Sequence, residues 1–171
     1  MIDLRKKHGR PPESTVELLL ECHERIRRFT RLSRELVRAQ ASHEQIADAA
    51  RSLCAYFGRA FLLHAEDEDR SIRPRLEAAG RLAAELEDVA RQHDDMHRVV
   101  ERLLEHWKAI ADAPSQRDAR RAELERDTEA LAARIERHLA FEEERVFPEL
   151  REILTPEADR EIVREMRARR A

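Results

Sequence analysis

The sequence predicts an all-α fold, namely an up-down-up-down four-helix bundle with a short additional helix at its C-terminal end. Its 171 residues include only 3 glycines, and aromatic residues make up only 4% of the chain, which argues against a β-sandwich or barrel. Hydrophobic residues nevertheless make up 42%. They recur at steps of three and four, the spacing of a helix that buries one face. Four long helices joined by short loops are typical of such a bundle.

Capping and proline signals set the boundaries of the predicted helices. Ser14 and Ser42 are each followed three residues later by Glu or Gln, which is the capping-box pattern of a helix start. Thr155 precedes Pro156, and proline is favoured at the first position of a helix. The predicted helices span residues 14–39, 43–71, 81–112, 116–146 and 156–169.

The same signals divide the chain into an N-terminal arm (1–13), a four-helix bundle (14–150) and a C-terminal helix with its tail (151–171). The 33 basic residues nearly balance the 36 acidic residues, for a net charge of -3, so the charge gives no reason to expect nucleic acid as a partner. We expect the basic residues at the two ends of the chain, including those from Arg167 to Arg170, to form solvated tails.

No apolar run approaches the roughly 20 residues of a membrane span. No apolar segment follows the basic residues near the start either, as a signal peptide would require. The sequence therefore predicts a cytoplasmic protein that binds no membrane. The two cysteines, Cys22 and Cys54, are too few for a disulfide framework and fall at different heights of their helices, so we expect two buried free thiols.

The inward stripe of each predicted bundle helix contains histidine, and in two stripes a glutamate follows one turn after it. The residues concerned are His23, His64, Glu68, His93, His97, His138 and Glu142. The remaining histidines, His8, His43 and His106, lie on no stripe and are expected at the surface. Four acidic residues beside the glutamates are expected to form a solvated face: Glu66, Asp67, Asp69 and Glu144. Glu66 or Asp67 is the alternative candidate for a group that orients an imidazole.

The histidine spacing repeats along the chain. His23 and His64 are 41 residues apart, as are His97 and His138. The pattern His-x3-Glu-x5-Pro occurs twice, with an offset of 74 residues. This repeat indicates two helical hairpins related by pseudo-two-fold symmetry around a shared centre.

Five imidazoles and two carboxylates on inward faces indicate a metal centre, because burying charged groups costs several kcal/mol each unless they are paired or bind metal. Imidazole and carboxylate donors suit Fe, Mn or Zn. Seven side chains are too many for one tetrahedral zinc ion, but they suit two octahedral ions bridged by Glu68 and Glu142. The three histidines of the last two helices would bind one ion. His23 and His64 would bind the other and leave it an open position.

These motifs, His, His-x3-Glu, His-x3-His and His-x3-Glu on four helices, resemble the hemerythrin family, including its bacterial cation-binding members. The resemblance covers residues 14–150 and fills all seven positions in order. It implies a non-haem di-iron centre, oxo- or hydroxo-bridged, that binds dioxygen at the less saturated ion. The same donors would also accept Mn or Zn.

The second bridging carboxylate has two candidates. Hemerythrin oxygen carriers place an Asp five residues after the last histidine, a position that Glu143 holds here. Other members use the glutamate four residues after it, which is Glu142. Helix geometry favours Glu142, because a step of five lies about 140° around an ideal helix.

The function indicated is the binding of O2, or of NO or peroxide, for storage, delivery, sensing or scavenging, with Phe61 as a candidate wall of the ligand pocket. A peroxidase-like or NO-reducing enzyme and a non-catalytic iron-binding regulatory module are the alternatives. A ferritin-like site is disfavoured, because no glutamate stands three residues before any of the five histidines.

Overall fold

The computed structural model describes residues 14–171, and within this range the regular elements are all helical. The all-α prediction is therefore confirmed. The predicted N-terminal arm, with His8, lies outside the described residues. The elements are α1 (Thr15–Arg38), α2 (His43–Ala55), η1 (Tyr56–Ala60), α3 (Phe61–Asp67), η2 (Glu68–Ile72), α4 (Arg73–Ala78), α5 (Ala83–Asp112), α6 (Gln116–Ala119), α7 (Arg121–Phe141), η3 (Glu142–Val146), α8 (Phe147–Ile153) and α9 (Pro156–Ala168).

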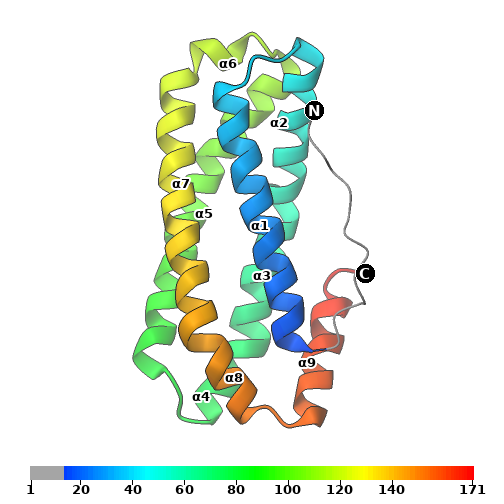
Figure 1. Ribbon diagram of the computed structural model, residues 1–171, viewed down its shortest axis with the longest axis vertical. Helices are drawn as coiled ribbons and strands as arrows, with labels where there is room; N and C mark the ends of the chain where they lie inside the picture. Colours follow the sequence, from blue (N-terminus) through cyan, green and yellow to red (C-terminus); the bar gives the residue numbers. More distant parts are fainter. Residues whose placement is uncertain (1–13) are drawn as a thin grey trace.

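Four long helical segments lie side by side along the long axis of the molecule, and successive segments run in opposite directions (Figure 1). They are α1, the run from α2 to α4, α5, and the run from α7 to α8. Helix α1 packs against α2 and α7, and α5 packs against the same two helices. Helix α9 lies beside the lower end of α1 and also contacts η2 (Figure 1). Among the described helices, none is both long enough and apolar enough to cross a lipid bilayer.

The predicted helix starts are confirmed at three positions. The Ser14 and Ser42 side chains each accept a hydrogen bond from the backbone N–H three residues later, and each forms a full capping box. The Thr155 side chain accepts from the Ala158 N–H at the start of α9. These contacts satisfy backbone donors that have no partner inside a helix.

The second and fourth long segments are not the continuous helices that the sequence predicted. Each contains a π-helical turn that begins at a glutamate, Glu68 in η2 and Glu142 in η3. A proline follows each turn, Pro74 and Pro148, at the start of the next helix. Proline cannot donate the helical N–H, and its ring crowds the carbonyl four residues earlier, so a wider turn accommodates it.

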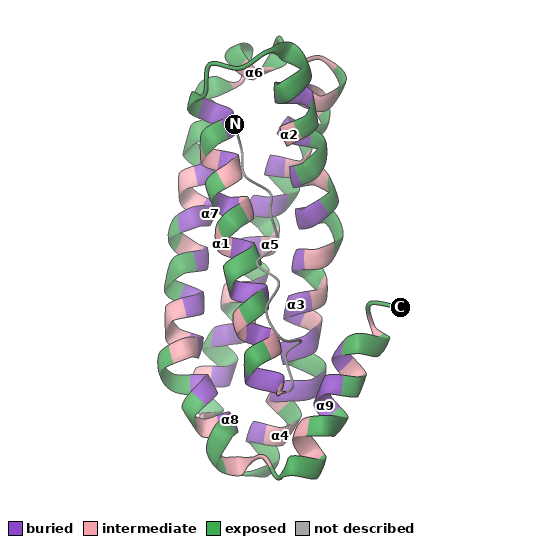
Figure 2. Ribbon diagram, turned by 45° about the vertical axis from the view of Figure 1, so that its right-hand side comes forward, coloured by how far each residue is buried: buried purple, intermediate pink, exposed green. Residues whose placement is uncertain are grey.

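Two apolar clusters fill the interior, with buried side chains on the inward faces of the helices (Figure 2). The larger cluster includes Phe57, Leu103 and Trp107. The smaller one, at the end that carries α9, includes Leu76 and Leu150. Along each long segment, the predicted ligand histidines fall between residues of the two clusters. The candidate centre is therefore a polar layer between two apolar cores.

Candidate metal centre

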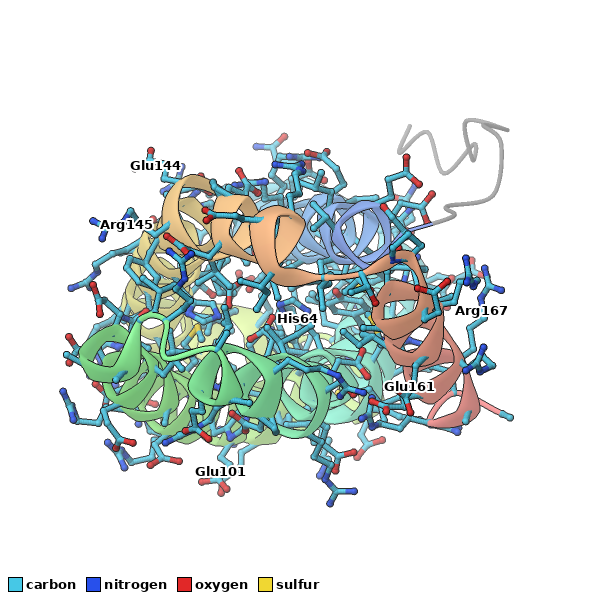
Figure 3. The ribbon with its side chains drawn as sticks, turned by 90° about the horizontal axis from the view of Figure 1, so that it is seen from below. His64, Glu101, Glu144, Arg145, Glu161 and Arg167 are labelled. Carbon is cyan, nitrogen blue, oxygen red and sulfur yellow. The ribbon has the colours of Figure 1, made fainter. Side chains whose placement is uncertain are left out.

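Four histidines and two glutamates from the four long segments meet in this polar layer. They are His23 (α1), His64 (α3), Glu68 (η2), His93 (α5), His138 (α7) and Glu142 (η3). Each is at most 5% exposed. Seen along the bundle axis, His64 lies in the interior between the helices (Figure 3). The helical spacing places each side chain on an inward face, and the pairing of the segments brings the faces together.

Glu68 lies between imidazoles from three segments. Its Oε1 is 2.9 Å from His64 Nε2, and its Oε2 is 2.9 Å from His93 Nε2. The same Oε2 is 3.7 Å from His138 Nε2. The two oxygens of this carboxylate therefore face different histidines.

Glu142 has the same arrangement on the opposite side of the layer. Its Oε2 is 3.1 Å from His23 Nε2, and its Oε1 is 3.5 Å from His138 Nε2. The candidate ligand atoms form two groups, and those of each group lie within 4.8 Å of one another. The groups are His23, His64, Glu68 and Glu142, and Glu68, His93, His138 and Glu142. Both carboxylates belong to both groups.

Most of the candidate ligand atoms in the layer are buried, and their contacts with residues 14 to 171 do not have the angles of a hydrogen bond. They are His23 Nε2, His64 Nε2, both oxygens of Glu68, and Glu142 Oε2. A buried polar atom without a partner costs about 1–3 kcal/mol. Lone pairs that converge without hydrogen bonding to one another suit a cation between them, so the donor set fits metal ions.

The outer nitrogen of His23 contacts the acid that follows Glu142. Glu143 Oε1 lies 2.8 Å from His23 Nδ1, and it also accepts a hydrogen bond of 2.8 Å from Arg27 Nη1. The pKa of Glu143 is lowered: burial raises it, but the contacts with Arg27 and His23 outweigh that effect. An ionised Glu143 fixes the His23 ring with Nδ1–H outward and leaves Nε2 free to bind metal.

Two further side chains serve the same purpose on the other half of the layer. Gln92 Oε1 lies 3.1 Å from His138 Nδ1, and Asp69 Oδ1 lies 3.5 Å from His93 Nδ1. Sequence reasoning missed these roles and placed Asp69 on a solvated face. A signal was present, because an acid directly follows the ligand-type glutamate in both repeats, at Asp69 and Glu143.

His97 belongs to neither group. It is one helical turn from His93, is partly buried, and packs the edge of its ring against Phe61 with 6.2 Å between the ring centroids. Its Nε2 is buried and has no hydrogen-bond partner among the described residues. Burial and the charge of His93 lower the pKa of His97, which keeps this imidazole neutral.

The pseudo-symmetry differs in register from the 74-residue offset. The contacts make His23 equivalent to His93, since each touches a layer glutamate through Nε2 and the following acid through Nδ1. The offset had instead paired His23 with His97. The difference is one helical turn, so an identical residue spacing did not identify the equivalent imidazole.

Without metal, the charges of the layer stabilise one another. Burial lowers the pKa of His93, but its contacts with Asp69 and Glu68 have a larger effect and raise the pKa to about 10. The pKa of His64 is likewise raised well above its usual value, because the Glu68 charge outweighs burial. Burial raises the pKa of Glu68, but the His64 charge and contacts with three imidazoles hold it well below its usual range. Metal ions would take the place of these imidazole protons.

One cluster corrects two expectations: Asp67 is not part of the solvated acidic face, and Arg169 and Arg170 are not part of a solvated tail. Asp67 is fully buried, and its oxygens pair with Arg169, 2.7 Å from Nη1, and with Arg170. Asp69 and Glu144 are exposed, as expected, and Glu66 is partly exposed. The prediction failed for Asp67 because its partners come from the far end of the sequence, which no local pattern reveals.

The expectation of a surface position is also wrong for His106. Its ring is buried between α5 and α7, with Nε2 3.9 Å from Asp127 Oδ2, which is itself buried. His43 is exposed, as expected. Cys22 and Cys54 are free thiols, but only Cys22 is buried, and Cys54 is partly exposed.

Comparison with known proteins gives a family match over most of the chain. The model of the family described as "Hemerythrin HHE cation binding domain" matches residues 14–168. A protein of Haemophilus influenzae described as an "Uncharacterized protein" is 26% identical over 161 residues, which cover 91% of this chain and 89% of that protein. No solved structure gives a significant match.

Proposed function

Because the chain belongs to the hemerythrin HHE cation-binding family, we propose that its polar layer binds two iron ions and, at them, a small ligand such as O2, NO or peroxide. His23 and His64 would hold one ion, and His93, His97 and His138 would hold the other. Glu68 and Glu142 would be shared by both. The up-down-up-down four-helix bundle, with α9 as the additional helix, is part of the same proposal and is supported by the alternating direction of the long segments.

One observation carries the proposal: each carboxylate turns its two oxygens toward histidines of different groups. Glu68 faces His64 with Oε1 and His93 with Oε2. Glu142 faces His23 with Oε2 and His138 with Oε1. A carboxylate that is shared in this way suits a pair of ions better than one ion.

The chemistry of the donors is compatible with iron. The two groups offer imidazole nitrogen and carboxylate oxygen and no thiolate, a set typical of Fe, Mn and Zn. The group with His23 and His64 has fewer histidines than the other once His97 is included, so it leaves a coordination position for a ligand. A reduced iron pair, when bound, supplies the electrons that hold a diatomic oxidant at that position.

The space beside the carboxylates suits a small ligand. A void of about 20 Å³ adjoins Glu68 and Glu142, and Ile72, Val89 and Val146 are among its apolar walls. A volume of about 15 Å³ is the least that holds one water molecule. Phe61, the candidate pocket wall, does not line this void and packs against His97 instead.

The test is an optical spectrum of iron-loaded protein that has been chemically reduced, recorded before and after admission of O2. We expect about two iron ions per chain and a visible absorption band that O2 produces and evacuation removes. Rapid turnover of peroxide without a stable band would favour the enzyme alternative. An iron spectrum that does not change with O2, NO or peroxide would favour the regulatory module. An iron content well under one ion per chain would refute the metal centre.

A further inference from the structure

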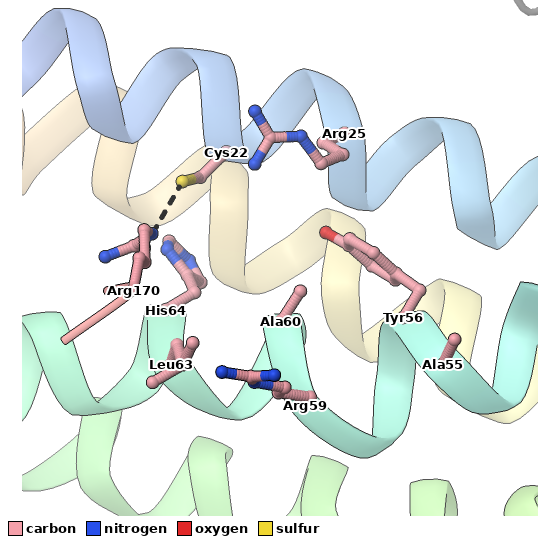
Figure 4. A pocket seen from close by; sticks show the side chains of 9 residues that line it. All are labelled: Cys22, Arg25, Ala55, Tyr56, Arg59, Ala60, Leu63, His64 and Arg170. Carbon is pink, nitrogen blue, oxygen red and sulfur yellow. Dashed lines mark hydrogen bonds between the residues drawn. The ribbon is translucent and has the colours of Figure 1, made fainter. Parts of the chain in front are cut away.

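A separate cavity lies on the outer side of His64, between α1, the segment from α2 to α3, and the C-terminal end (Figure 4). Its volume is about 280 Å³, far larger than the void beside the carboxylates. The polar side chains that line it are Cys22, Arg25, Tyr56, Arg59, His64 and Arg170. Neither Glu68 nor Glu142 lines it, so a ligand in this cavity would be recognised by other side chains.

The mouth of the cavity carries uncompensated positive charge. Arg25 and Arg59 are exposed, and neither has an ion pair or hydrogen bond with any residue from 14 to 171. Arg170 is different, because its guanidinium group pairs with the buried Asp67 and only its edge approaches the cavity, with Nη2 3.9 Å from Cys22 Sγ. No acidic side chain lines the cavity. Two guanidinium groups therefore face the opening without a counter-charge.

The inner wall contains the one imidazole of the layer whose outer nitrogen lacks an oxygen partner. His23, His93 and His138 each place Nδ1 within 3.5 Å of an oxygen of Glu143, Asp69 or Gln92. His64 Nδ1 is buried and has no nitrogen or oxygen partner among the described residues, and the Cys22 thiol contacts the same ring. Sulfur is a weak acceptor. A ligand in the cavity could supply the oxygen partner that His64 Nδ1 lacks.

Tyr56 forms a further wall of the cavity. Tyr56 is held by a stacked contact with Phe29, with 3.9 Å between ring centroids and 5° between ring planes, and its oxygen points into the cavity toward Arg25 (Figure 4).

We propose that this cavity binds a small oxyanion of the phosphate or carboxylate class. The guanidinium groups of Arg25 and Arg59 supply its counter-charge, since their planar forks match both kinds of anion. The Tyr56 hydroxyl and His64 Nδ1–H donate to its oxygens. The His64 contribution rests on the proposed function, because ligation of iron through Nε2 leaves the hydrogen on Nδ1. The anion then holds His64 as Glu143 holds His23.

The direct test is equilibrium dialysis of iron-loaded protein against labelled inorganic phosphate, at an ionic strength held constant with sodium chloride. We expect one phosphate per chain. Arg25→Gln and Arg59→Gln should each weaken binding by about tenfold or more, since a hydrogen bond to a charged group contributes roughly 1.5–3 kcal/mol. Arg31→Gln is the matched control, because Arg31 is exposed on the same helix but does not line the cavity. Competition by succinate would place the ligand in the carboxylate class, and its absence in the phosphate class.

A second measurement locates the bound anion. In Cys54→Ala protein, Cys22 is the only thiol, and phosphate should slow its alkylation by the neutral reagent N-ethylmaleimide. That slowing should be lost in Arg25→Gln. The iron content should be unchanged in both arginine variants, which separates this proposal from the proposed function. Phosphate binding that survives both arginine substitutions but disappears in Glu142→Gln would place the anion on the metal and overturn the proposal. Absence of phosphate and succinate binding would also overturn it.

Discussion

Glu142 and Glu143 are adjacent in the chain, yet they contact opposite nitrogens of the same imidazole. Glu142 Oε2 lies 3.1 Å from His23 Nε2, and Glu143 Oε1 lies 2.8 Å from His23 Nδ1. Glu142 is 2% exposed and Glu143 is 29% exposed. One acid therefore faces the interior of the layer, and the other orients the ring from outside.

This division of roles predicts different effects for the two substitutions. Glu142→Gln should lose at least one metal ion per chain, because it removes a carboxylate shared by both groups. Glu143→Gln should keep the full metal content at saturating iron but bind it about 10–100-fold more weakly, as is typical when a group that orients a ligand is lost. Metal analysis and competition with a chelator measure the two effects. A greater loss of metal in Glu143→Gln would make Glu143 the bridging carboxylate.

The histidines should also differ in how much each contributes to iron binding. His138→Ala removes a side chain that contacts Glu68, Glu142 and His93, so we expect loss of at least one ion. His97→Ala leaves both groups complete, and we expect weaker binding of one ion rather than its loss. His43→Ala is the control, because His43 is exposed at the start of α2. Iron stoichiometry of the purified variants provides the comparison, and equal losses in His97→Ala and His138→Ala would refute the ranking.

The buried carboxylate of Asp67 should contribute to stability through the C-terminal end. Asp67→Asn removes the partner of Arg169 and Arg170, which are only partly exposed, and should lower the free energy of unfolding by about 1–3 kcal/mol. The exposed pair of Asp48 and Arg51 gives the control: Asp48→Asn should change stability by no more than about 0.5 kcal/mol. Urea denaturation of both variants measures the difference. Equal effects would mean that the Asp67 cluster contributes no more than a surface ion pair.

The metal-free protein should lose stability as the pH rises above neutrality. The pKa of His93 is about 10 in the folded chain, against about 6.5 in an unfolded one. A raised pKa means that the stabilisation is fully present below pH 6.5 and is lost as the pH rises toward 10. Denaturation of metal-free protein at intervals from pH 6.5 to 10 should show this fall, and His93→Gln should flatten it. A wild-type profile as flat as that of His93→Gln would contradict the assignment.

Much of the fold follows from local signals, and the exceptions have a common cause. The capping boxes at Ser14 and Ser42 predicted two helix starts, because a cap needs only residues three positions apart. The sequence predicted the second and fourth segments as continuous helices that end at residues 71 and 146, shortly before Pro74 and Pro148. The start of a π-helical turn at Glu68 and Glu142 was not predictable, since a π-helical turn depends on how the later residues pack.

The candidate site shows the same limit. Helical spacing is enough to place His64 and Glu68 on one face, and the repeat indicates that two such faces meet. Spacing alone could not tell which histidine of α5 is equivalent to His23, because His93 and His97 lie on the same face. It also could not assign Asp67 or His106 to the interior, since Arg170 and Asp127 reach them from other elements.

The polar layer lies between the two apolar cores of the bundle. Leu76 and Leu150 belong to the core on one side, and Leu103 belongs to the other. Bound ions would hold all four long segments at that level and join both cores into one cooperative unit. Without the ions, the smaller core, against which α9 packs, would unfold locally while the larger core stays folded. Hydrogen exchange at Leu76 and Leu150 would then accelerate long before exchange at Leu103, so metal occupancy would set the size of the unit that unfolds.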